Sequence, residues 1–250
     1  MNIDDSTTSL TGLSFSREGA SDVASVTSVA KAFGIRVADS NGKRSSASML
    51  INKMYGWKGY GSNYKVGEGP DQLTLVAADY RSGTPIGTIT VGLDRTNGLL
   101  VDANYLDEAN RLRDQGCKLC EMTKFAIERH INSKHLLAAL FHVAYIYAHY
   151  LNHGTDLLIE VNPSHVSFYR RLLHFEIYGE EKMCPRVNAP SVLMWLSLKH
   201  AQEMIGLHGG KTENSAERSL YPHFFSANEE AGIVERLKRV ENIVGEEASA

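Results

Sequence analysis

A carboxylate within an apolar segment is the first residue of this sequence whose type suggests chemistry. Glu121 lies in the run CKLCEMTKFAI, residues 117–127, where the alternation of residue types predicts a β-strand. Burial of a carboxylate is costly and raises its pKa, so Glu121 is either a general base or half of an ion pair. Alternation places Glu121 and Thr123 on one face of the strand and Lys124 on the other, unless a bulge re-aims one of them.

Cysteines and histidines occur at spacings close to those of redox and metal sites, without matching them. Cys117 and Cys120 have the C-x-x-C spacing, but within a strand that spacing sends the two thiols to opposite faces. His135, His142 and His149 recur every seven residues, about 10.5 Å apart along a helix, which is too far to share an ion. We therefore predict packing roles for these residues and no metal site.

Tyr169 is a second candidate for chemistry. It lies four residues after His165, in a predicted helix that directly follows the apolar strand 157–161. Ligands of open α/β sheets bind beyond the carboxyl ends of strands, although a helical tyrosine is more often a core residue. Both interpretations stay open at this point.

Hydrophobic spacing predicts the elements that position these residues. Together they form a mixed α/β sheet, mostly antiparallel, with an early hairpin, one strand–helix–strand crossover and helices at the end. The predicted strands are 33–38, 73–80, 86–93, 117–127, 157–161, 175–178 and 192–198. The predicted helices are one capped by Ser45 or Ser46 after a turn at 39–44, then 105–115, 136–151, 165–173 opened by Asn162 and Pro163, and a last one beginning at Ser226.

The 250 residues divide into three predicted parts. Residues 1–29 are a polar lead-in, residues 30–200 form one domain, and residues 201–250 are a linker and a helical extension. The apolar stretch 136–151 would rise only about 24 Å as a helix, short of a bilayer's hydrocarbon core, so we predict no transmembrane segment.

The charge and the cysteine content limit the possible binding partners and the expected cellular location. Lys and Arg number 26 against 29 Asp and Glu, a formal net charge of -3, which gives no basic field for nucleic acid. Three cysteines are a small and odd number, which argues against a secreted disulfide framework. A polar start without an apolar run is no secretory signal, so the expected location is the cytoplasm.

Several segments, taken together, resemble the bacterial N-acyl amino acid synthases, which include the long-chain N-acyl tyrosine synthases. This group has the GCN5-related N-acyltransferase (GNAT) fold, a mixed, mostly antiparallel twisted sheet flanked by helices, and is similar to the acyl-homoserine lactone synthases. The resemblance covers roughly residues 30–198 and implies a transferase that forms an amide. It rests on MYGWKGYG (54–61), CEMTKFAIE (120–128), IEVNPSHVSFYRRLLHFEIYGEE (159–181) and CPRVNAPSVLMWL (184–196).

The resemblance implies attack of an amino acid's α-amine on a fatty acyl thioester. Acetyl-CoA-dependent relatives hold the pyrophosphate on a glycine-rich loop, but here the corresponding stretch, Glu128 to His135, contains no glycine. This departure favours acyl-phosphopantetheine on acyl carrier protein as donor, with no resident cofactor. Basic residues suited to an acidic carrier protein are Arg129, Lys134, Arg170 and Arg171, although a solvated basic turn is an equal alternative.

The resemblance also implies roles for individual residues. Glu121 is the expected base, directly or through a water, and Tyr169 the expected acid for the leaving thiolate. Backbone N–H groups from Lys124 to Ala126 would hold the thioester oxygen if the strand is bulged there. The expected substrate-binding residues are Arg36 or Lys124 for the acceptor's carboxylate, with Thr123, Phe125 and Ala126 nearby. The aromatic cluster of Tyr55, Trp57 and Tyr60 either lines the pocket for the acyl or aromatic group or belongs to the core.

Two alternatives belong to other classes of function. One is a signal synthase of the acyl-homoserine lactone type, and the other is a non-catalytic module that binds an acyl group or its carrier protein. Tyrosine as acceptor follows from the resemblance alone. A hydrophobic product leaves association with a membrane surface open.

Overall fold

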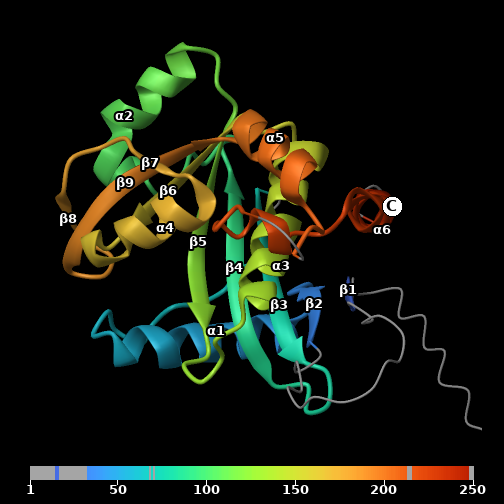
Figure 1. Ribbon diagram of the computed structural model, residues 1–250. Helices are drawn as coiled ribbons and strands as arrows, with labels where there is room; N and C mark the ends of the chain where they lie inside the picture. The colour runs from blue at the N-terminus through green and yellow to red at the C-terminus, as the bar shows by residue number, and fades with distance from the viewer. Residues whose placement is uncertain (1–14, 17–32, 68, 70, 213–215, 248–250) are drawn as a thin grey trace, which may run out of the picture.

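The computed structural model describes residues 15–16, 33–67, 69, 71–212 and 216–247. Its described strands form one sheet in the order β1-β2-β3-β4-β5-β6-β9-β7, and β8 pairs with β9 (Figure 1). The strands are β1 (Phe15–Ser16), β2 (Phe33–Val37), β3 (Gln72–Asp79), β4 (Pro85–Leu93), β5 (Leu119–Ile127), β6 (Asp156–Val161), β7 (Glu176–Ile177), β8 (Lys182–Cys184) and β9 (Ala189–Ser197).

Helices cover both faces of this sheet. They are α1 (Asn41–Trp57), α2 (Asp102–Asp114), α3 (Lys134–Tyr145), α4 (Val166–Leu173), α5 (Leu198–His208) and α6 (Ala227–Glu247). A π-helical turn, Ile146–Leu151, extends α3, and a 3₁₀ turn, Pro163–His165, precedes α4. No described helix is long and apolar enough to cross a membrane.

The strand–helix–strand crossover predicted from the sequence is confirmed. β5 and β6 are parallel and connected through α3, whereas the other pairs are antiparallel, including the predicted hairpin of β3 and β4. The parallel pairing joins only Leu119–Glu121 to Asp156–Leu158. Beyond these three pairs the two strands separate, which opens the middle of the sheet.

Strand β5 has a bulge shortly after its last pair with β6. Thr123 pairs with Thr90 and Ala126 with Thr88, so Lys124 and Phe125 both lie opposite a single residue of β4. Lys124 has φ of 50°, in the left-handed region, and the Thr88 hydroxyl donates a hydrogen bond to its carbonyl at 2.8 Å. The sequence allowed for a bulge here, and the structure contains one.

Alternation along the strands divides the core into two sides. Leu157, Ile159 and Val161 of β6 pack with α3 and α4, whereas Leu158 packs with α2 on the opposite face. Ala126 of β5 packs with α1, also on the α2 side. The separated ends of β5 and β6 thus lie between an α3/α4 face and an α1/α2 face (Figure 1).

The predicted start of the first helix is wrong, and two elements were not predicted. Helix α1 begins at Asn41, so 39–44 is its cap and first turn; Ser40 is the cap and accepts from the Lys43 N–H at 3.4 Å. Ser46 lies inside the helix and donates to the Gly42 carbonyl instead. Helix α5 and the short strand β8 were not predicted: β8 has only three residues, whereas the helical spacing of Leu198, Ala201 and Ile205 in α5 was overlooked.

The final segment is attached to α3 by a buried histidine. Ser226 begins α6 with the predicted capping box, its N–H donating to Glu229 at 2.8 Å. His142 is fully buried, accepts the Phe225 N–H on Nδ1 at 2.9 Å and lies 2.7 Å from Glu230 through Nε2. The Phe225 bond leaves the proton of neutral His142 on Nε2, from which it is donated to Glu230.

Titration of His142 should give stability a measurable pH dependence. Burial lowers the pKa of His142 in the folded protein. The contribution of neutral His142 to the free energy of unfolding is therefore complete above the unfolded-state pKa of about 6.5 and is lost as the pH falls from there toward the folded-state pKa. In urea unfolding, wild type should lose stability from pH 7 to pH 5, and His142→Gln should lose less. The exposed His130→Gln variant serves as control and should follow wild type. Equal pH slopes for wild type and His142→Gln would contradict this.

Candidate active site

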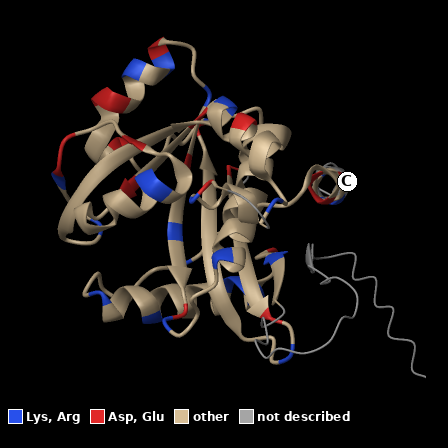
Figure 2. Ribbon diagram, in the orientation of Figure 1, with Lys and Arg blue, Asp and Glu red and all other residues tan. Residues whose placement is uncertain are grey.

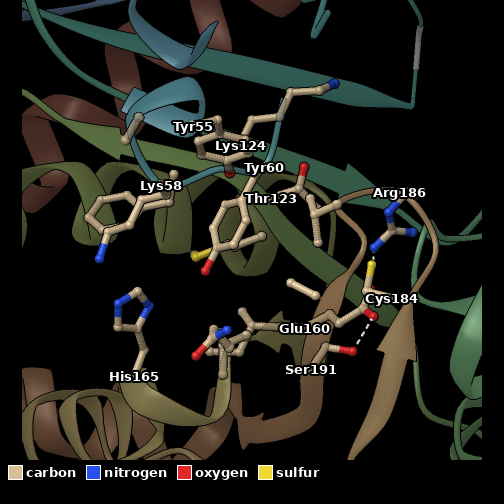
Figure 3. Close-up of a pocket in the computed structure, with 18 of the residues that line it drawn as sticks. Tyr55, Lys58, Tyr60, Thr123, Lys124, Glu160, His165, Cys184, Arg186 and Ser191 are labelled. Atoms are coloured by element: carbon tan, nitrogen blue, oxygen red, sulfur yellow. Dashed lines mark hydrogen bonds and ion pairs between the residues drawn. The ribbon is translucent and has the colours of Figure 1, made fainter. Parts of the chain in front are cut away.

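A cavity of about 570 Å³ occupies the gap where β5 and β6 separate (Figure 3). Its walls come from the end of α1, from β5 and β6 beyond their last pair, from the start of α4, and from the segment joining β8 to β9. Figure 3 shows Lys58 and His165 at one end, well apart from Arg186 and Ser191. Because the gap connects the two faces of the sheet, the cavity has walls of different character.

The wall on the α3/α4 face is apolar. The Phe125 ring lies 5.0 Å from that of Phe141 on α3, and Phe141 lies 6.4 Å from Tyr169 on α4. Ile159 and Phe168 complete this part of the lining. A slot of this kind excludes water and suits an alkyl chain.

The wall on the α1/α2 face carries the charged groups. The Glu160 side chain is 5% exposed, accepts the Ser191 hydroxyl at 2.7 Å and forms an ion pair with Arg186. Arg186 also donates to the Leu100 carbonyl. The cavity therefore joins an apolar slot to a polar end with an oriented carboxylate and guanidinium.

Three tyrosines from α1 and the loop after it lie over the cavity. The rings of Tyr60 and Tyr64 lie 5.9 Å and 4.9 Å from that of Tyr55. The Tyr64 hydroxyl donates to the Tyr60 carbonyl at 2.6 Å, which fixes this cluster. It forms an aromatic wall beside the polar end.

The bulge of β5 forms part of the cavity lining. Residues Thr123 to Ala126 all line the cavity, at the point where β5 no longer pairs with β6. Burial lowers the pKa of the Lys124 ammonium, with Glu121 opposing that shift. The bulge thus brings strand backbone and a cation to the boundary between the two walls.

Tyr169, the candidate acid of the sequence analysis, lies on the apolar wall. It is 8% exposed, and its hydroxyl makes no hydrogen bond with the described part of the chain. Burial raises its pKa, which keeps the hydroxyl protonated and able to donate.

Glu121 lies next to the cavity and does not line it. Its two carboxylate oxygens accept the N–H groups of Leu100 and Val101 at 2.9 and 3.1 Å. Burial raises its pKa and these two hydrogen bonds oppose the shift. The carboxylate therefore holds the loop before α2, and Leu100 of that loop lines the cavity.

The other predicted residues are divided between the cavity and the surface. Tyr55, Thr123, Lys124, Phe125 and Ala126 line the cavity. Arg36 is exposed on β2, and Trp57 is 54% exposed under the Arg129 guanidinium, 3.7 Å away, so neither lines it. Lys134, Arg170 and Arg171 are exposed as well.

The polar end of the cavity was not predicted from the sequence. Glu160 lies within the predicted strand 157–161 and belongs to no motif, and Arg186 lies in a segment quoted only for its resemblance. Lys58, His165, Cys184 and Ser191 were also missed as lining residues. No group of described residues could hold a metal ion, and the described cysteines are free.

The chain has the GNAT fold, and its similarity to known proteins identifies it as an acyltransferase. A solved N-acyl amino acid synthase from uncultured soil microbes, FeeM, is 27% identical, with a TM-score of 0.60 over 68% of this chain and 93% of that chain. The family model for the N-acyl amino acid synthase FeeM matches residues 46–197, and the chain belongs to that family.

Other matches are more distant. An acyl-CoA N-acyltransferase from Pseudomonas aeruginosa is 14% identical, with a TM-score of 0.45 over 66% of this chain and 98% of that chain. The acyl-homoserine lactone synthase LasI is 14% identical, with a TM-score of 0.46 over 66% and 90%. No curated protein sequence matches the chain.

Replacing Glu121 should destabilise the loop it holds. In Glu121→Gln the new NH₂ group faces a backbone N–H, which should lower the free energy of unfolding by about 1–3 kcal/mol. Urea unfolding measures this, with the exposed Asp107→Asn as control. A Glu121→Gln variant as stable as the control would contradict the assigned contacts.

Proposed function

We propose that this N-acyltransferase joins a long-chain fatty acyl group, carried on acyl carrier protein, to the α-amine of a free amino acid, with tyrosine as the first acceptor to test. The observation that carries the proposal is the cavity itself. Its apolar wall suits an alkyl chain, its polar end suits a charged head group, and the two meet at the bulge of β5.

The reaction needs a proton acceptor, an oxyanion site and a proton donor. The acceptor's α-ammonium first loses a proton to solvent, and the neutral amine attacks the thioester carbon. Glu160, the carboxylate on the cavity wall, takes the second proton from the nitrogen as the C–N bond forms. Backbone N–H groups at Lys124 to Ala126 stabilise the oxyanion. The C–S bond then breaks, the amide forms, and Tyr169 donates a proton to the carrier's thiolate. The proton held by Glu160 returns to Tyr169 through solvent, which restores both groups.

Glu121 then has an indirect role. It does not line the cavity, its oxygens accept the Leu100 and Val101 N–H groups, and the Leu100 carbonyl accepts from Arg186. Glu121 therefore positions the loop that steadies Arg186, whereas the sequence alone suggested it as the base.

The residues at the start of α3 support a donor bound to a carrier protein. The stretch before it lacks glycine, and the Ser133 hydroxyl accepts the Leu136 N–H at 3.2 Å, so one first-turn amide is already bonded. A carrier thioester brings one phosphate and no pyrophosphate to this end of the molecule. Lys58 and His165 line the cavity there.

Basic residues lie on the two helices beside that end. Neither α1 nor α4 contains an acidic residue, and Figure 2 shows Lys and Arg on both. Arg129, Lys134, Arg170 and Arg171 are exposed and suited to the acidic surface of a carrier protein.

The function is tested with purified protein, palmitoyl-acyl carrier protein and single amino acids. Mass spectrometry should detect one or a few N-acyl amino acids. Glu160→Gln should lower kcat about 10²- to 10⁴-fold, and Tyr169→Phe about tenfold because thiolates leave readily. Glu121→Gln should retain more activity than Glu160→Gln. No amide from any amino acid, or the opposite order of the two glutamate variants, would contradict the proposal.

The carrier surface is tested separately by charge reversal. The double variant Arg170→Glu, Arg171→Glu should raise KM for the palmitoyl carrier protein about tenfold and leave KM for palmitoyl-pantetheine unchanged. Arg81→Glu, on the β3–β4 hairpin, is the control. Equal effects on both donors would place these arginines outside the docking surface.

A further inference from the structure

We infer that Arg186 binds the α-carboxylate of the acceptor and so restricts the enzyme to free α-amino acids. The inference rests on the proposed function and adds the residue that selects the substrate class. It differs from the sequence-based expectation, which gave this role to Arg36 or Lys124.

The guanidinium of Arg186 has donors to spare inside the cavity. It donates once to Glu160 and once to the Leu100 carbonyl, and a guanidinium carries further N–H donors in the same plane. Its side chain is 33% exposed and lines the cavity. Two N–H groups of a guanidinium can donate in parallel to the two oxygens of a carboxylate, so a carboxylate is the ligand that best matches these donors.

Glu160 holds this guanidinium in position. Its other oxygen accepts from Ser191 at 2.7 Å and from the Asn104 amide at 3.1 Å, so the carboxylate is anchored from two further elements. An arginine already held by Glu160 and the Leu100 carbonyl loses little conformational entropy when a substrate binds its remaining N–H groups. The pair also places a negative group for the acceptor's ammonium next to a positive group for its carboxylate.

The other cationic candidates fit the role less well. Arg36 is on β2 and does not line the cavity. Lys58 lines the end that Figure 3 shows well apart from Glu160. Lys124 lies at the bulge, where the thioester must be held, and burial lowers the pKa of its ammonium.

This arrangement predicts which acceptors are rejected. An amine that lacks the α-carboxylate leaves the Arg186 donors unpaired, and a peptide places an amide carbonyl where the carboxylate should lie. The aromatic wall of Tyr55, Tyr60 and Tyr64 then contacts the acceptor's side chain without deciding whether a carboxylate is required.

The test compares tyrosine with tyramine, which differs only in the missing carboxylate. For wild type with palmitoyl carrier protein, kcat/KM should favour tyrosine by about 10- to 100-fold, the value of a hydrogen-bonded charge pair. If another amino acid is preferred, it is compared with its own decarboxylated amine. Arg186→Gln should lose this preference mainly through KM, and Arg186→Lys should restore part of it. Arg81→Gln is the control arginine.

Calorimetry of amino acid binding without any donor separates this inference from the proposed function. If wild type binds the amino acid and Arg186→Gln binds it at least tenfold more weakly, the inference stands even when no amide is formed. If amides form but Arg186→Gln keeps the acid-over-amine preference, the inference is overturned and the function stands. If neither binding nor amide is detected, both are overturned. Circular dichroism establishes that each variant is folded.

Discussion

The early end of the parallel pairing between β5 and β6 is the constraint on which the site depends. Only three residue pairs join these strands, the last at Glu121, and β5 is bulged shortly afterwards at Lys124 and Phe125. A bulge leaves backbone groups without a partner strand, and the strand bends locally. The sheet therefore opens at its centre, and the backbone of β5 forms part of one wall of the opening.

The opening matters because the two faces of the sheet differ in chemistry. Aromatic and aliphatic side chains from α3 and α4 line one face, and an ion pair steadied by the loop before α2 lies on the other. Three buried or half-buried acidic groups are satisfied in different ways: Glu121 by backbone N–H groups, Glu160 by Arg186 and Ser191, and Glu230 by His142. A long apolar donor and a small charged acceptor can thus approach the same point from opposite sides of the sheet.

Much of the fold could be predicted from the sequence, and less of the site. Local signals were sufficient for the β3–β4 hairpin, the β5–α3–β6 crossover and the capping box at Ser226, because each depends on neighbouring residues. Glu160 and Arg186 were missed because they meet only through pairing of β6 with β9 and the turn after β8, 26 residues apart in the chain. Glu121 was singled out for burial, but sequence could not show that the Leu100 loop occupies its oxygens.

The central claim is that donor and acceptor meet across the open sheet, and a crystal structure with an N-acyl amino acid bound tests it most directly. We predict the alkyl chain against Phe125, Phe141 and Tyr169, the amide carbonyl beside the bulge at Lys124, and the carboxylate on Arg186. A chain lying along the α1/α2 face, or a carboxylate held at the Lys58 and His165 end, would contradict it.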